Sequence, residues 1–336
     1  MTENPKAPLL KKKDFQSDQE VRWCPGCGDY AILAAVQRTM AKVGATLEDT
    51  VVISGIGCSS RFPYYMNTYG FHTIHGRAPA FATGLKVSRP ELDVWVITGD
   101  GDALSIGGNH LLHVLRRNVN VQLLLFNNQI YGLTKGQYSP TSDVGQVTPS
   151  SPLGSIDQPV TPVRVALGAG ARFIARGYDV SKRLPDVLEA SYRFQGSAFV
   201  EILQNCPVFN DGVFELITDR KRGPQHQLWL EHGKPMLLAD GSQGVRLNPQ
   251  TMRAEVVAVG EGGVSEDQLL VHDETNRNLA WMIADLPDVK ALGILYREEG
   301  APVYDQSARA QVEMAQDQHG EADMNALLRS GHTWTV

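Results

Sequence analysis

The chain has 336 residues, 42% of them hydrophobic, which suffices for one α/β core and an additional segment. Lys and Arg total 31 against 37 Asp and Glu, and the formal net charge of −6 gives no basic field for nucleic acid. No apolar run approaches the ~18 residues of a membrane helix, and the polar N-terminus lacks a signal-peptide pattern. We therefore expect a cytoplasmic protein with neither nucleic-acid nor membrane partners.

Composition divides the chain into three expected segments. Residues 1–20 are polar and contain prolines, which predicts a flexible N-terminal tail. Residues 21–215 hold most of the apolar runs and all the cysteines, and we expect them to form the ligand-binding domain. Residues 216–336 differ in composition and are expected to form a C-terminal extension that contacts a partner.

Alternating apolar runs and amphipathic stretches indicate strands separated by helices. Strands are expected at 50–56, 92–98, 121–126, 171–175 and 198–203, and helices at 29–43, 78–86, 105–117 and 185–194. Because such crossovers are right-handed, the pattern predicts an α/β fold with a doubly wound, mostly parallel sheet. The segment 139–162 is rich in Ser, Thr, Gly and Pro, so we expect a long loop that covers a site or contacts a partner.

The four cysteines are Cys24, Cys27, Cys58 and Cys206. The first two form a tight Cys-Pro-Gly-Cys loop before a predicted helix, and each of the others follows a predicted strand. A disulfide framework is not expected in a cytoplasmic protein. Four thiolates with none left over fit either a zinc ion or a 4Fe-4S cluster, and composition does not separate these two.

Oxygen ligands follow the two central strands. One strand ends at a Gly-Asp-Gly turn around Asp100, and the next ends at Asn127 and Asn128. Gly-Asp-Gly alone is also an ordinary turn, but both ends open at the sheet edge where doubly wound folds bind ligands. Carboxylate and amide oxygens suit Mg²⁺, which shares its coordination shell with phosphates.

The 28 positions from Asp100 to Asn128 resemble the spacing of the thiamine diphosphate motif. In that motif the aspartate, the asparagine and the carbonyl two residues later hold Mg²⁺ against the diphosphate. The resemblance thus implies Asp100, Asn128 and the carbonyl of Ile130 as metal ligands.

Longer stretches resemble the β subunits of 2-oxoacid:ferredoxin oxidoreductases. They are RWCPGCGDYAIL, SGIGCSSRFPYY, TIHGRAPAFATGLK, GDGDALSIGGNH with NNQIYGLTKGQYSPTS, and QNCPVFN, in the right order over about residues 21–210. The later stretch AEVVAVGEGGVSEDQLLVHDETNRNLAWMIADLP is similar to members that act on 2-oxoglutarate.

This resemblance implies thiamine diphosphate, Mg²⁺ and one 4Fe-4S cluster that the four cysteines ligate. Lys135 is a candidate for binding the substrate carboxylate, with a solvated loop lysine as the alternative, and His75 is the second candidate catalytic residue. The implied thiamine contacts are Ile56, Gly57, Cys58, Ser59, His75, Gly99, Gly101, Asp102, Asn128, Gly132, Leu133 and Thr134.

The implied reaction is the reversible oxidative decarboxylation of 2-oxoglutarate to an acyl-coenzyme A, with electrons passing through the cluster to ferredoxin. Pyruvate and branched-chain 2-oxoacids are the alternative substrates. Because the chain has length for only the diphosphate-binding half of a thiamine site, an α subunit, or α plus γ, is expected to supply the pyrimidine-binding half in paired αβ units.

Two other classes of protein explain less of the sequence. A zinc-stabilised binding subunit without catalysis would explain the cysteines but not Asp100 and Asn128. A non-redox thiamine decarboxylase would explain the Asp100 motif and leave the four cysteines without a role.

Overall fold

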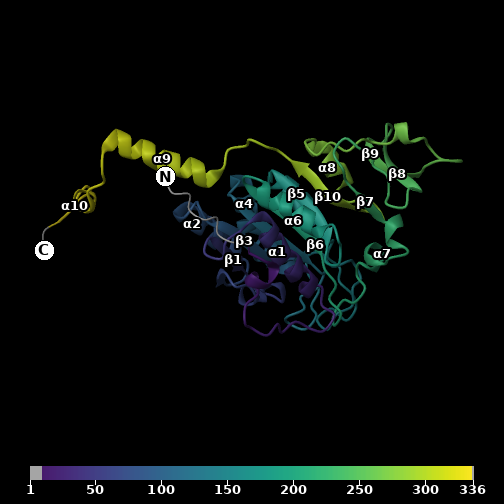
Figure 1. Ribbon diagram of the computed structural model, residues 1–336, viewed down its shortest axis with the longest axis horizontal. Helices are drawn as coiled ribbons and strands as arrows, with labels where there is room; N and C mark the ends of the chain where they lie inside the picture. Colours follow the sequence, from purple (N-terminus) through teal and green to yellow (C-terminus); the bar gives the residue numbers. More distant parts are fainter. Residues whose placement is uncertain (1–9, 335–336) are drawn as a thin grey trace.

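The computed structural model describes residues 10–334 and is built around an eight-stranded sheet with helices on both faces (Figure 1). The strand order is β2-β1-β3-β4-β6-β5-β10-β7. The strands are β1 (Thr50–Ser54), β2 (Tyr69–His72), β3 (Asp93–Gly99), β4 (Val121–Asn127), β5 (Phe173–Tyr178), β6 (Ser197–Leu203), β7 (Gln227–Trp229) and β10 (Lys290–Arg297).

Neighbouring strands from β2 to β5 are parallel, whereas β10 runs antiparallel to β5 and parallel to β7. The expected doubly wound, mostly parallel sheet is therefore confirmed. Parallel strands need crossover helices, and these bury both faces of the sheet.

Helices α1 and α6 pack on one face of the sheet, and α2, α4, α5 and α8 pack on the other. Each face forms its own apolar cluster with alternate residues of the strands. The helices are α1 (Asp29–Val43), α2 (Ala78–Ser88), α3 (Asp100–Leu104), α4 (Gly108–Arg117), α5 (Pro162–Gly168), α6 (Leu184–Arg193), α7 (Glu215–Thr218), α8 (Arg277–Ile283), α9 (Tyr304–His319) and α10 (Met324–Leu328). Short 3₁₀-helices lie at Lys12–Phe15, Ser59–Tyr65, Gly223–Gln225 and Glu266–Gln268.

The helix predicted over 105–117 is shorter than expected. The structure begins α4 at Gly108 and forms a separate short helix, α3, over residues 100–104. The break brings the backbone of Gly107 against that of Gly76, where an added Cβ on Gly76 would lie 2.4 Å from the Gly107 Cα. Asp100 therefore opens a helix at the end of β3 rather than standing in a simple turn.

The structure differs from the expected flexible tail over residues 10–20. Phe15 is fully buried and belongs to the apolar cluster on the α1 face. Gln16 also forms an isolated antiparallel bridge with Met66. One aromatic side chain thus anchors a polar segment whose composition does not indicate packing, while residues 1–9 lie outside the described part of the chain.

The segment after residue 215 contributes to the central sheet and also extends away from it. Strands β7 and β10 form one edge of the sheet, and a separate hairpin joins β8 (Gln243–Asn248) to β9 (Arg253–Ala258). Helices α9 and α10 then extend away from the sheet (Figure 1). Between residues 10 and 334, no helix combines the length and apolarity that a membrane span requires.

Candidate active site

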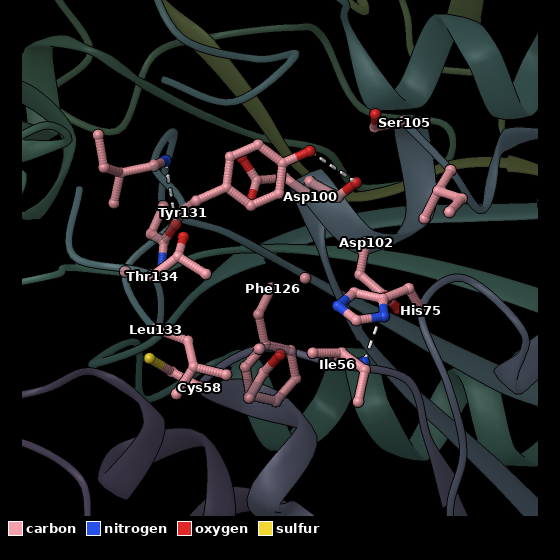
Figure 2. Close-up of a pocket in the computed structure, with 18 residues that line it drawn as sticks. Ile56, Cys58, His75, Asp100, Asp102, Ser105, Phe126, Tyr131, Leu133 and Thr134 are labelled. Carbon is pink, nitrogen blue, oxygen red and sulfur yellow. Dashed lines mark hydrogen bonds between the residues drawn. The ribbon is translucent and has the colours of Figure 1, made fainter. Parts of the chain in front are cut away.

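A pocket of about 200 Å³ opens at the carboxyl ends of β1, β3 and β4 (Figure 2). Every residue that the sequence suggested as a thiamine contact lines it, as do Asp100 and Ile130. The sequence did not indicate four further lining residues, Ser105, Ile106, Phe126 and Tyr131. The fold therefore brings together residues from four separate stretches of sequence, although their roles remain predictions.

Asp100 is buried at the base of this pocket. The hydroxyls of Ser139 and Thr141 each donate to its Oδ2 at 2.6 Å, and among the described residues no side chain donates to its Oδ1. Burial raises the pKa of Asp100, and the two hydroxyl hydrogen bonds oppose that rise. The two hydroxyls thus hold one oxygen of the carboxylate, and the backbone N–H groups of Asp100 and Gly101 also hydrogen-bond to this carboxyl.

Asn128 and Ile130 also line the pocket, from a turn after β4. The Asn128 Nδ2 donates to Gln204 Oε1 at 2.8 Å, and its Oδ1 accepts from the Ile130 N–H at 3.2 Å. Gln129 between them has a φ of 55°, a left-handed backbone conformation that residues other than glycine rarely adopt. Within residues 10–334, the Ile130 carbonyl accepts no hydrogen bond from the protein.

Asp102 holds three segments together at the rear of the pocket (Figure 2). Its Oδ1 accepts from the backbone N–H groups of Ile56, at 3.1 Å, and Gly76, at 2.7 Å. Its Oδ2 accepts from the Thr98 hydroxyl at 2.8 Å. Because a Cβ on Gly55 would lie 1.9 Å from Asp102 Oδ2, only glycine fits there.

Tyr131 packs its ring against Gly101, where an added Cβ would lie 2.1 Å from Tyr131 Cε1. The Tyr131 hydroxyl donates to the Gly101 carbonyl at 3.2 Å (Figure 2). This contact connects the turn after β4 to the start of α3. The second glycine of the Gly-Asp-Gly sequence, Gly101, therefore has a packing reason.

The four cysteines line a second pocket of about 210 Å³. This cysteine pocket shares Cys58, Asn128, Gly132 and Leu133 with the first. A Cβ on Gly132 would lie 3.5 Å from Cys58 Sγ and 3.6 Å from Cys206 Sγ, so the backbone at this position separates the two spaces. The expected convergence of the thiols is thus a feature of the fold, with the amino end of α1 next to Cys27.

The four thiols differ in burial, because Cys206 is buried, Cys27 and Cys58 are half-buried and Cys24 is exposed. Burial raises the pKa of Cys58 to about 12, and it also raises the pKa of Cys27. Burial raises the pKa of the neighbouring Asp29 carboxyl to about 7. Among the described residues, no group of three or more His, Cys, Asp or Glu side chains is arranged to hold a metal ion.

Lys135 lies in the cysteine pocket and not in the lining of the first pocket. Its φ of 75° is left-handed, which is rare for a residue with a side chain and marks local backbone strain. Its suggested contact with a substrate carboxylate therefore stays a prediction, whereas His75 lines the first pocket and lies beside Asp102 and Ile56 (Figure 2).

The fold and the first pocket define a subunit that binds thiamine diphosphate. Residues 55–202 match the family model described as "Thiamine pyrophosphate enzyme, C-terminal TPP binding domain". This range contains the Asp100 motif and all the lining residues of the first pocket.

Three relatives place the chain more narrowly. It is 51% identical to the 2-oxoglutarate oxidoreductase subunit KorB of Mycobacterium tuberculosis, over 97% of this chain and 88% of that protein. It is 47% identical to subunit beta of 2-oxoacid:ferredoxin oxidoreductase 1 of Aeropyrum pernix, over 56% of this chain and 60% of that one. A solved structure of 2-oxoglutarate:ferredoxin oxidoreductase from Magnetococcus marinus matches with a TM-score of 0.75 and 33% identity, covering 98% of both chains.

The chain belongs to the β-subunit family of 2-oxoacid:ferredoxin oxidoreductases. It is accordingly one subunit of an oxidoreductase that contains more than one kind of chain.

Proposed function

We propose that this chain is the thiamine diphosphate-binding β subunit of a 2-oxoglutarate:ferredoxin oxidoreductase. It would take part in converting 2-oxoglutarate and coenzyme A into succinyl-coenzyme A and CO₂, with electrons leaving for ferredoxin. The observation that carries the proposal is the adjacency of the two pockets, which share Cys58 and Gly132. The similar Magnetococcus marinus structure has 2-oxoglutarate, coenzyme A and succinyl-CoA bound, which supports the choice of substrate.

The oxygen atoms in the first pocket fit Mg²⁺ and a diphosphate. Asp100 offers Oδ1, Asn128 offers its amide oxygen, and the Ile130 carbonyl has no protein partner among the described residues. One carboxylate, one amide and one carbonyl leave room for phosphate oxygens and water in an octahedral shell. We propose these residues as the ligands of Mg²⁺.

The cysteine pocket is the proposed site of a 4Fe-4S cluster, which four thiolates would ligate. The cysteines surround a space of about 210 Å³. We propose that Cys24, Cys27, Cys58 and Cys206 hold one cluster, and a thiolate-bound cluster agrees with the expected cytoplasmic location.

The residues of this chain would position the cofactor and the substrate, and the bound groups would supply the chemistry. Thiamine diphosphate, when bound, supplies the carbon nucleophile and the electron sink for decarboxylation, and the cluster supplies a one-electron acceptor. Asp102 fixes the backbone beside Ile56 and the loop that carries His75. The apolar side chains of Ile56 and Phe126 line the pocket and would keep water from the reacting carbon.

The described residues contain only part of a thiamine site. The two carboxylates in the pocket lining are Asp100 and Asp102, and both already accept hydrogen bonds from the protein. No glutamate of residues 10–334 lines the pocket. The carboxylate that activates the pyrimidine ring must therefore come from another chain, which we propose is an α subunit or an α and a γ subunit.

The test uses this chain co-expressed with its α partner. We would compare kcat/KM for 2-oxoglutarate, pyruvate and 2-oxoisovalerate with ferredoxin as the electron acceptor. The proposal expects 2-oxoglutarate to be preferred, and a tenfold preference for either monocarboxylate, about 1.4 kcal/mol, would contradict the substrate assignment. Iron and zinc analysis of the same anaerobic preparation tests the cluster, because a colourless zinc protein would contradict it.

A further inference from the structure

A row of buried polar side chains crosses the carboxyl half of the sheet behind Asp100. It begins at Arg176 on β5 and Glu201 on β6, which are register partners in the parallel ladder. Arg176 Nε lies 2.7 Å from Glu201 Oε2, and the two side chains are only 3% and 2% exposed. A buried ion pair is costly to form because both charges lose their hydration, and in some proteins it contributes to conformational specificity rather than to stability.

The row continues from Glu201 toward the pocket. Glu201 Oε1 accepts from Asn127 Nδ2 at 2.8 Å, and Asn127 Oδ1 lies 3.0 Å from the Thr141 hydroxyl. That hydroxyl also lies 2.6 Å from Asp100 Oδ2. Its single proton faces two acceptors, and the shorter, charge-assisted hydrogen bond is the one to Asp100.

Asn127 differs from its neighbour Asn128 in its position relative to the first pocket. Asn127 is buried and does not line the first pocket, whereas Asn128 does. The amide oxygen of Asn127 also accepts from the Gln129 N–H at 3.3 Å. Asn127 therefore supports the turn and the hydroxyls around it, and has no contact with the pocket.

The other end of the row reaches the C-terminal segment. The guanidinium of Arg176 donates to the carbonyl of Ala284 at 3.1 Å, just after α8, and to the carbonyl of Ala291 on β10 at 3.3 Å. Every charged group in the row thus has partners, which is the condition under which such a network makes a core rigid. The network joins the region of Asp100 to two carbonyls that lie more than a hundred residues away in sequence.

We propose that Ser139 and Thr141 are positioning residues that hold Asp100 with its Oδ1 toward the metal. We also propose that the Arg176–Glu201 pair anchors them through Asn127, which accepts from the Gln129 N–H. The Gln129 carbonyl in turn accepts from the Ser142 hydroxyl, and Ser142 Oγ accepts from the Ser139 N–H. This inference rests on the proposed function, because it assumes that Asp100 binds Mg²⁺. Residues that orient a metal ligand typically change metal affinity ~10- to 100-fold when they are removed.

The experiment measures Mg²⁺ affinity at a fixed thiamine diphosphate concentration, by calorimetry of the co-expressed complex. Thr141→Val removes the hydroxyl and keeps the shape, and we expect it to weaken Mg²⁺ binding ~10-fold or more. Thr141→Ser keeps the hydroxyl and should restore binding to within ~3-fold, since only a methyl group is lost.

Thr50→Val is the matched control. Thr50 is also fully buried, and its hydroxyl donates to the Thr46 carbonyl at 2.6 Å, but it lies at the amino end of β1, away from the pocket. We expect it to lower Tm without changing Mg²⁺ affinity. Equal Mg²⁺ affinity in Thr141→Val and wild type, or equal weakening in Thr50→Val, would overturn the proposal.

Two further readouts separate positioning from general damage. Mn²⁺ bound in place of Mg²⁺ should show an altered electron paramagnetic resonance spectrum in Thr141→Val and in Glu201→Gln, and an unaltered one in Thr50→Val. An unchanged spectrum and affinity in a folded Glu201→Gln variant would overturn the anchoring role of the ion pair. If that variant does not fold, the comparison of Thr141→Val with Thr141→Ser still decides the positioning role.

Failure of the wild-type complex to bind Mg²⁺ with thiamine diphosphate would instead overturn the proposed function.

Discussion

The two pockets on either side of Gly132 differ in what holds their polar groups. In the first pocket, Asp100 and Asp102 accept hydrogen bonds from hydroxyls and backbone N–H groups at 2.6 to 3.1 Å. In the cysteine pocket, Cys27 Sγ accepts from Gln204 Nε2 at 3.3 Å and also hydrogen-bonds with Asp29. The carboxylate oxygens of the first pocket are thus held by protein hydrogen bonds, whereas few protein hydrogen bonds hold the thiols.

This difference follows from the chemistry of the two ligand sets. A buried carboxylate is costly unless it is hydrogen-bonded, so a fold that buries Asp100 must also supply donors. A buried thiol can stay protonated and behaves as a small apolar group, which agrees with the raised pKa values of Cys27 and Cys58. We infer that the first pocket is formed before its cofactor binds and that the cysteine pocket is completed by its cluster.

The largest effect is expected from Cys206→Ser, which removes the one buried thiol of the four proposed cluster ligands. Bound iron should fall to a small fraction, and ferredoxin reduction should fall more than ~100-fold, because losing a ligand exceeds the cost of losing an outer contact. Iron analysis and a ferredoxin reduction assay check this. Full iron content in the variant would show that the fourth ligand lies elsewhere.

Asp100→Ala should have the next largest effect, and it should be confined to the first pocket. Removing the one carboxylate of the proposed metal set should weaken Mg²⁺-dependent binding of thiamine diphosphate by more than ~100-fold. Circular dichroism and iron content should stay as in wild type. If affinity is unchanged, Asp100 is not a metal ligand, and if iron is lost as well, the two pockets are not independent.

Asp102→Ala tests the hydrogen bonds that hold the first pocket in shape. The N–H groups of Ile56 and Gly76 would lose their partner, at a cost of ~1 to 3 kcal/mol for each buried donor. We expect a lower Tm and a ~10-fold or greater loss of kcat. Asp102→Asn should be much milder, because the amide oxygen can still accept from both N–H groups and its NH₂ can donate to the Thr98 hydroxyl. Equal losses in the two variants would mean that the charge, and not the hydrogen bonding, is what matters.

Removing the cluster from wild type should leave the first pocket almost unchanged. In anaerobically prepared, cluster-free protein we expect hydrogen exchange to rise at residues 22–28 and 204–210 and to stay constant at α3. Affinity for thiamine diphosphate with Mg²⁺ should change less than ~3-fold, as for independent sites. A large loss of affinity would mean that the cluster also organises the thiamine pocket.

Sequence patterns were sufficient where the signal is local or where spacing is characteristic. The helix over 29–43 is observed with the expected bounds. Gly44 ends it in a left-handed backbone conformation, and the Gly44 N–H donates to the Met40 carbonyl. Asp100 and Asn128, which the motif spacing paired, both line the first pocket, and the four cysteines all line the cysteine pocket, while the roles of these residues stay predictions.

The support around these residues could not be predicted in the same way. The strand expected at 171–175 is observed at Phe173–Tyr178. The apolar run ends before Arg176, but the strand continues because Glu201 on the next strand compensates the buried charge of Arg176. Ser139 and Thr141 lie in a segment of many hydroxyls, and no spacing tells which of them face Asp100. Strand β2 was also missed, since all its side chains are exposed and no buried pattern marks it.

The smallest effect is expected from Tyr131→Phe, which tests how finely the first pocket is preorganised. The substitution keeps the ring that packs on Gly101 and removes only the hydroxyl that donates to the Gly101 carbonyl. A neutral hydrogen bond contributes ~0.5 to 1.5 kcal/mol net, and at 3.2 Å in a half-buried position this one should lie at the lower end. We therefore expect affinity for thiamine diphosphate to fall only ~2- to 5-fold, with iron content unchanged. Isothermal titration of the co-expressed complex measures this, and Tyr131→Leu is the control that also removes the flat ring. A loss above ~100-fold in Tyr131→Phe would show that the hydroxyl contacts the cofactor directly rather than the protein.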